Sequence, residues 1–99
     1  MTLWDRITTK HKFPDGSKII VLHRYALQFE RDGRSIDIGF EQALETDIDR
    51  LIHEGSITEW CVPEGRKPVT GLERAEILAR VEEYCVVKSL TYRVVRIAN

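Results

Sequence analysis

The sequence predicts an α+β domain: a twisted antiparallel sheet of about five strands, with one main C-terminal helix packed on one face and a final strand after it. Three features predict this. Apolar residues recur at helical spacing after Thr70, and residues 90–97 then change to β-branched and aromatic types. In the first half, apolar residues alternate with polar ones around an Asp-Gly dipeptide at 32–33. At 99 residues, the chain is expected to form a single domain, 1–99.

The helix is predicted to begin after Thr70. Glu73 stands three residues further on, where a capping box places the side chain that bonds back to the N-cap. Five apolar residues then share one stripe: Ile77, Leu78, Val81, Tyr84 and Cys85. The other side is charged, as on a solvated helix face, with Glu73, Glu76, Arg80 and Glu83.

The first half favours antiparallel strands. Alternation over 7–13, a Pro-Asp-Gly turn at 14–16 and a β-branched run over 18–22 predict two of them. The odd positions from Ile19 to Phe29 are predicted to occupy one face of a long, bent strand. These positions are Ile19, Val21, His23, Tyr25, Leu27 and Phe29.

The dipeptide at 32–33 predicts a type I′ hairpin. With these two residues as the loop, Phe29 faces Ile36, Leu27 faces Ile38, and Tyr25 faces Phe40, all on one face. A slip of one residue would destroy the match, so the register is well specified. The residues expected to dominate the core are Phe29, Ile36, Ile38, Phe40, Leu78 and Val81.

Residues 41–55 leave two alternatives open. The apolar residues Leu44, Ile48, Leu51 and Ile52 fit a helix, whereas residues 47–53 also fit a short strand. Residues 57–69 are expected to form a loop, because prolines and a glycine interrupt them. Trp60 is expected to anchor this loop to the core.

The sequence contains no segment that predicts membrane insertion or secretion. No apolar run is long enough for a transmembrane helix, and residues 1–12 lack the apolar core of a secretory signal. We therefore expect the chain to stay in the cytoplasm unless another system carries it. Cys61 and Cys85 are not spaced as a metal or redox motif, and Cys85 is expected to be a small buried hydrophobe.

Motifs for catalysis are missing from the sequence, which has no phosphate-binding loop, dinucleotide fingerprint, nucleophile elbow or zinc-protease helix. A metal at His23, or a Cys61 nucleophile assisted by His23 or His53, is disfavoured because no spacing supports it. We expect no catalytic residue, metal or cofactor. The net charge of −1 and only a thin basic stripe disfavour nucleic-acid binding.

The last two-thirds of the chain resemble a known family. The matching residues are Arg34 to Glu41, Ile57 to Trp60 with Pro63, Thr70, Glu73-Arg74, Ile77, and Tyr92 to Val95. This pattern resembles immunity protein family seventy-four of bacterial polymorphic-toxin systems, over roughly Tyr25 to Ile97. The resemblance implies a non-enzymatic inhibitor that binds a toxin domain encoded nearby.

Charge clustering, independently of the resemblance, indicates where such a partner would bind. Residues 40–54 hold five carboxylates against the single Arg50. If the toxin is basic, we expect the contact at Glu41, Glu45, Asp47 and Asp49, with Trp60 as a desolvated anchor. The alternatives are that this segment is a plain solvated face, and that the protein is a general interaction module, a monomer or a homodimer formed through a sheet edge.

Overall fold

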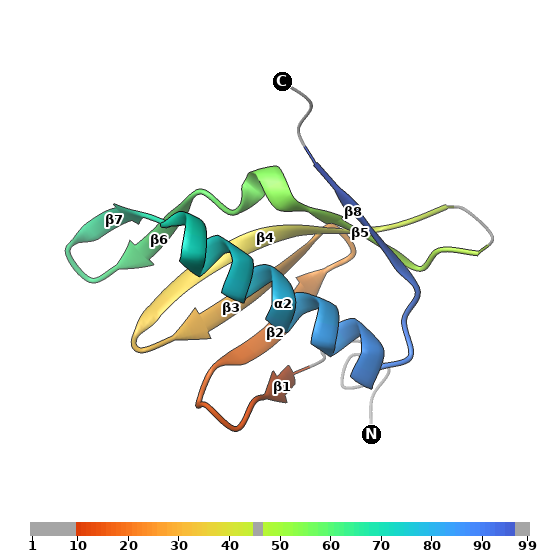
Figure 1. Cartoon of the computed structure of the whole chain (residues 1–99), viewed down its shortest axis with the longest axis horizontal. Helices are drawn as coiled ribbons and strands as arrows, with labels where there is room; N and C mark the ends of the chain where they lie inside the picture. Colours follow the sequence, from red (N-terminus) through yellow and green to blue (C-terminus); the bar gives the residue numbers. More distant parts are fainter. Residues whose placement is uncertain (1–9, 45–46, 97–99) are drawn as a thin grey trace.

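The fold was established from a computed structural model, which describes residues 10–44 and 47–96. Eight strands, one short 3₁₀ turn and one long helix follow one another along these residues (Figure 1). In order they are β1 (Lys10–Lys12), β2 (Lys18–His23), β3 (Ala26–Arg31), β4 (Arg34–Gln42), β5 (Arg50–His53), η1 (Glu54–Ser56), β6 (Glu59–Val62), β7 (Gly65–Pro68), α2 (Gly71–Val87) and β8 (Tyr92–Val95).

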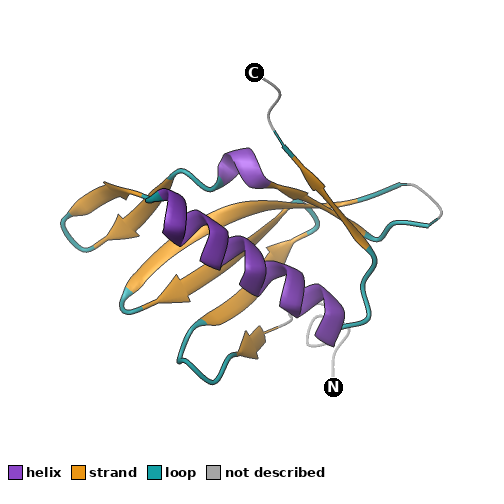
Figure 2. Cartoon of the chain, viewed as in Figure 1, coloured by secondary structure: helices purple, strands orange, loops and turns teal. Residues whose placement is uncertain are grey.

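The molecule has two layers, a twisted sheet and the helix α2 lying across one of its faces (Figure 2). The strands follow the order β1-β2-β3-β4-β5-β8, and β6 pairs with both β4 and β7. This confirms the predicted α+β class, the C-terminal helix and the final strand. The sheet is mixed, however, because β8 runs parallel to β5. The chain crosses the sheet through α2 before β8, and such a crossover delivers a parallel strand.

The β3–β4 hairpin has the predicted register. Phe29 pairs with Ile36 and Leu27 with Ile38. Asp32 and Gly33 both have positive φ, 53° and 75°, as a type I′ turn requires. The third predicted pair is connected by its backbone, but Tyr25 is 57% exposed whereas Phe40 is buried.

A single long strand over residues 19–29 is wrong. The chain turns at residues 24–25, and β2 and β3 form a separate hairpin with a shift in register between Val21 and His23. Ile19, Val21, Leu27 and Phe29 still lie on the covered face, while His23 and Tyr25 at the turn are exposed. The prediction that odd-numbered positions share one face is therefore correct for four of the six residues, because side chains still alternate between the two faces within each short strand.

The ambiguous segment contains a strand. β5 occupies residues 50–53, where Ile52 is buried opposite Phe40 of β4. Leu44 is almost fully exposed, which excludes it from an apolar helix stripe. The strand is specified by pairing with β4 and β8, contacts that a local apolar count does not report.

The expectation of a loop over residues 57–69 is also wrong, because β6 and β7 form a hairpin there. Gly65 begins β7 with φ of 134°, and Pro68 ends a strand at the edge of the sheet, where proline is tolerated. Trp60 on β6 is fully buried, which confirms it as the anchor of this segment.

The helix begins and ends with defined caps. Thr70 accepts from the backbone of Glu73, and the Glu73 carboxylate accepts from the backbone of Thr70, so the predicted capping box is present. At the other end, Ser89 has φ of 57°, and the Leu90 N–H donates to the carbonyl of Cys85, as in a Schellman motif. All five residues of the predicted stripe are buried. Among the described helices none is long and apolar enough to cross a membrane.

Candidate binding surface

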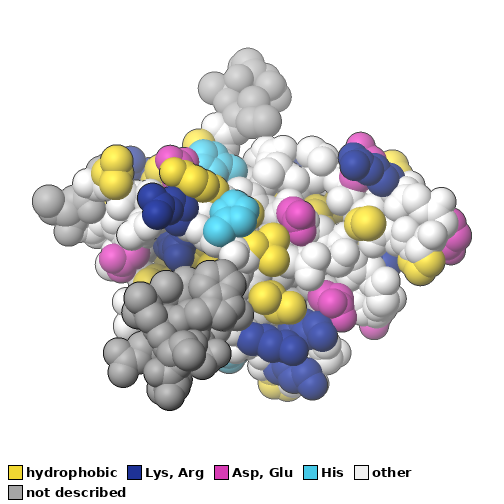
Figure 3. Space-filling model, turned by 180° about the vertical axis from the view of Figure 1, so that it is seen from behind, with side chains coloured by type: hydrophobic (Ala, Val, Ile, Leu, Met, Phe, Trp, Pro, Cys, Tyr) yellow, Lys and Arg dark blue, Asp and Glu magenta, His cyan; other side chains and the backbone are white. Residues whose placement is uncertain are grey.

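The face of the sheet opposite α2 is open over much of its described part. On β4, Ile36, Ile38 and Phe40 are buried under the helix, so the alternate residues 35, 37, 39 and 41 point to the other side. Figure 3 shows the molecule from behind, where charged side chains of both signs and histidines lie among apolar ones. This open face is therefore a mixed surface of charged, polar and apolar side chains.

Glu41 lies on the open face and is held by a histidine. The Nε2 atom of His53 lies 2.9 Å from Oε1 of Glu41. His53 is the partner of Gly39 across the β4–β5 ladder, and a Cβ built on Gly39 would lie only 2.9 Å from the Cβ of His53. The glycine thus lets the two strands approach closely enough for the imidazole to reach Glu41.

Asp49 fastens the start of β8 to the start of β5. Its Oδ2 atom accepts from the backbone N–H of Thr91 at 2.9 Å and from the Thr91 hydroxyl at 3.0 Å. These bonds lower the pKa of Asp49, because they favour the charged carboxylate. The Ala43 N–H donates to the Asp49 carbonyl, which places Asp49 two residues along the open face from Glu41.

The remaining predicted carboxylates stand at the β4–β5 loop. Asp47 is exposed and forms no hydrogen bond or ion pair with any described residue, and Glu45 lies outside the described residues. Arg50, the one basic residue of the segment, turns inward: its guanidinium donates to the carbonyls of Arg24 and Phe40, and burial lowers its pKa. The surface of this segment is therefore more acidic than its composition suggests.

Trp60 belongs to the core instead of the surface. Its indole is fully buried beneath α2, with the Arg34 guanidinium 4.5 Å and the Arg31 guanidinium 5.7 Å from its ring. The Nε1–H approaches the Glu73 carboxylate without reaching hydrogen-bond geometry. A partner does not reach Trp60 in this conformation. Trp60 anchors its own segment to the core, and the expectation that it also serves as a desolvated anchor for the toxin is wrong.

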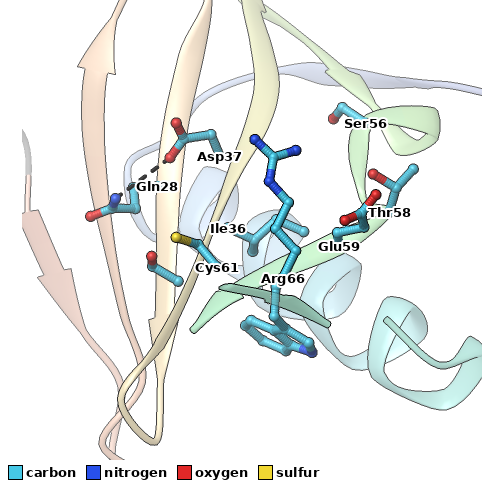
Figure 4. A pocket seen from close by; sticks show the side chains of 10 residues that line it. Gln28, Ile36, Asp37, Ser56, Thr58, Glu59, Cys61 and Arg66 are labelled. Carbon is cyan, nitrogen blue, oxygen red and sulfur yellow. Dashed lines mark hydrogen bonds between the residues drawn. The ribbon is translucent and has the colours of Figure 1, made fainter. Parts of the chain in front are cut away.

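A cleft of about 330 Å³ opens between β4 and the segment from η1 to β7. Figure 4 shows Arg66 crossing it, with Asp37 on one side and Ser56 and Glu59 on the other. Its remaining lining residues are Gln28, Ser35, Ile36, Thr58, Trp60 and Cys61. The Ser56 hydroxyl has a structural role, because it donates to the His53 carbonyl and accepts from the Gly39 N–H.

The residues weighed for catalysis are scattered. Cys85 is buried, and burial raises the pKa of its thiol to about 12, which confirms the expected inert hydrophobe. Cys61 is exposed on β6, and His23 lies at the β2–β3 turn, where its Nδ1 accepts from the Tyr25 N–H. Across residues 10–44 and 47–96, no three histidine, cysteine or acidic side chains gather as metal ligands would.

Sequence reasoning missed the cleft, because it treated residues 57–69 as a loop. A signal was present: Trp60 to Val62 is strand-like, and Pro-Glu-Gly at 63–65 is a turn sequence. Recognising that hairpin would have placed Arg66 opposite Cys61, although the approach of both to Asp37 follows only from the pairing with β4.

Comparisons of the chain with protein-family models, with curated proteins and with solved structures found no match.

Proposed function

We propose that this protein is an immunity-type inhibitor, which binds a cognate bacterial toxin domain in the cytoplasm and neutralises it without catalysis. Its resemblance to immunity protein family seventy-four suggests this class of partner. The matching residues lie mostly in the scaffold: Ile36, Ile38 and Trp60 are buried, and Thr70 with Glu73 caps α2. The scaffold in turn supports the surface that would bind.

The observation that carries the proposal is the acidic end of the open face. Glu41 and Asp49 are held in place by His53 and Thr91, and Asp47 extends beyond them with no hydrogen bond or ion pair to a residue that the structure describes. A carboxylate that is already positioned loses little side-chain entropy on binding. Such a surface fits a toxin domain with a basic face.

Charge complementarity between the acidic end and the toxin would act mainly on the rate of association. Opposite potentials accelerate association and depend on ionic strength, whereas dissociation depends on closely packed, desolvated contacts. A toxin whose active site is basic, as in many nucleic-acid-cleaving domains, would be covered by the acidic end, and its substrate would be excluded.

The test uses the product of the adjacent upstream gene, which the proposal expects to be a large protein with a C-terminal toxin domain. Its binding to the purified chain is measured by surface plasmon resonance at two salt concentrations. Replacing Glu45 and Asp47 together by lysine is expected to weaken affinity by about tenfold at low salt, mostly through slower association. The effect should shrink as salt is added.

A matched control is Glu64→Lys, which reverses a charge in the β6–β7 turn at the other end of the sheet (Figure 1). We expect that variant to bind within about twofold of the parent, because exposed charges at this distance are screened. Failure of the parent chain to bind the toxin domain would contradict the proposed function. Unchanged affinity of the lysine double variant would contradict the assigned surface.

A second candidate is a homodimer formed by strand addition. β8 lies at the end of the strand order, so one of its edges is unpaired within the described sheet. Light scattering of the isolated chain tests it: a concentration-independent dimer would favour this candidate, and a monomer would contradict it.

A further inference from the structure

The cleft exists because the sheet splits beside β4. On that side β4 pairs with β6 only at Ser35 with Cys61, and with β5 only from Gly39 onwards. Asp37 lies between these two ladders, and its register partner is Gln28 on the opposite side. Its side chain points to the open face, so a carboxylate stands at the wall of the split.

The lining chemistry favours a cation. Asp37 and Glu59 provide carboxylates from opposite walls, and Gln28 and the hydroxyl groups of Ser35 and Thr58 add neutral acceptors. Arg66 is the only cationic side chain of the lining. Two carboxylates against one guanidinium leave a net charge of −1, which repels an anionic guest.

Arg66 shows the kind of group that fits. Its guanidinium crosses the cleft between Asp37 and Ser56 (Figure 4). It nevertheless forms no ion pair or hydrogen bond with a described residue, and it extends from an exposed edge strand. A long, unpaired side chain of this type rotates away at little cost.

From this arrangement we propose that the cleft receives an arginine side chain of the protein partner, and that Arg66 occupies the place until the partner binds. The inference rests on the proposed function for the identity of the partner, a basic toxin domain. The cleft lies on the same face as Glu41, four residues along β4 from Asp37. One partner could therefore contact both.

The guest is an arginine in preference to a lysine for a geometric reason. A guanidinium offers five N–H donors in a planar fork and can bond acceptors on two sides, whereas an ammonium is a compact point charge. The carboxylates of the cleft stand on opposite walls, so a flat group that spans them suits the site better.

The test uses the full chain and three small probes of matched shape. N-propylguanidinium represents the arginine side chain, N-propylurea is its neutral isostere, and butyrate is an anion. Each is titrated at constant ionic strength while backbone amide shifts are followed by NMR. We expect saturable shifts at Asp37, Thr58 and Glu59 with the guanidinium alone.

Removing an arginine from a binding site usually weakens binding, but here we expect the opposite, because Arg66 competes with the guest for the cleft. Removing a competing cation by Arg66→Gln should tighten binding of N-propylguanidinium by about fivefold, since an exposed charge contact is worth up to about 1 kcal/mol. Lys67→Gln removes the same charge from the next residue of β7, on the other side of the strand, and should leave affinity nearly unchanged. Replacing Asp37 by Asn and Glu59 by Gln together should abolish the shifts.

Two results would overturn the inference: no saturable guanidinium shifts at the cleft in the Arg66→Gln variant, or butyrate binding that disappears in that variant, as an anion site requires. The amide spectrum also reports whether each variant is folded. The NMR titration does not depend on the toxin assay. Failure of guanidinium binding at the cleft can therefore be distinguished from failure of the proposed function.

Discussion

The two faces of the sheet are made by neighbouring residues with opposite environments. Phe29 of β3 is fully buried under α2, whereas Gln28 beside it lies on the open face, where its amide bonds Asp37 at 3.5 Å. The covered face contains nearly all the large buried side chains, while the open face contains the carboxylates, His53 and the cleft. Neighbouring residues of one strand therefore have different roles: those on the covered face stabilise the fold, and those on the open face are available for binding.

The largest expected effect is on the covered face. Phe29→Ala should lower the free energy of unfolding by about 3–5 kcal/mol, because it removes a fully buried ring that packs near Trp60. Gln28→Ala should change it by less than about 0.5 kcal/mol. Urea denaturation of both variants checks the comparison, and equal losses would contradict the separation of the two faces.

Gly39 lies on the open face, but unlike Gln28 it is expected to matter for stability. Gly39→Ala should cost about 1–3 kcal/mol, because the new methyl group would lie 2.9 Å from the Cβ of His53 and force β4 and β5 apart. Exchanging the roles, with Gly39→Ala and His53→Gly together, should restore part of the loss. If denaturation shows no cost for Gly39→Ala, close strand approach does not constrain this position.

The smallest expected effect is at the helix start. Thr70→Ala should lower stability by about 1 kcal/mol, because the capping hydroxyl that accepts from the Glu73 N–H is lost. Thermal unfolding checks this change. The control is Thr58→Ala, which removes an exposed hydroxyl that bonds no described residue and should change stability by less than about 0.5 kcal/mol.

The same cap predicts a pH dependence. The backbone N–H of Thr70 donates to the Glu73 carboxylate and, with the Trp60 indole and Arg34 nearby, lowers the pKa of Glu73 from 4.5 to about 2. A folded pKa below the unfolded value means that the stabilisation is present above about pH 4.5 and is lost as the pH falls towards 2. The stability difference between the parent and Glu73→Gln should vanish across that interval, and a constant difference would contradict this cause.

Local chemistry predicted the elements whose partners are close in sequence. The β3–β4 hairpin follows from an Asp-Gly loop that accommodates two positive φ angles, and the helix follows from its capping box and stripe. The acidic segment was also visible from composition. The sequence did not reveal that Arg50 turns inward or that Asp49 holds Thr91, since both depend on residues of other strands and loops, 10 to 42 positions away.

By itself, then, the sequence determined the α+β class, the register of the β3–β4 hairpin and the start of the helix, because each depends on bonds and periodicity within a few residues. Only the tertiary structure decided that β6 pairs with β4, that Trp60 is out of reach of a partner, and that β8 lies parallel to β5. Those outcomes depend on pairing between distant segments, where the gain from burying a side chain exceeds any local preference. The cleft follows from the same pairing, because it lies where two of those ladders along β4 fail to meet.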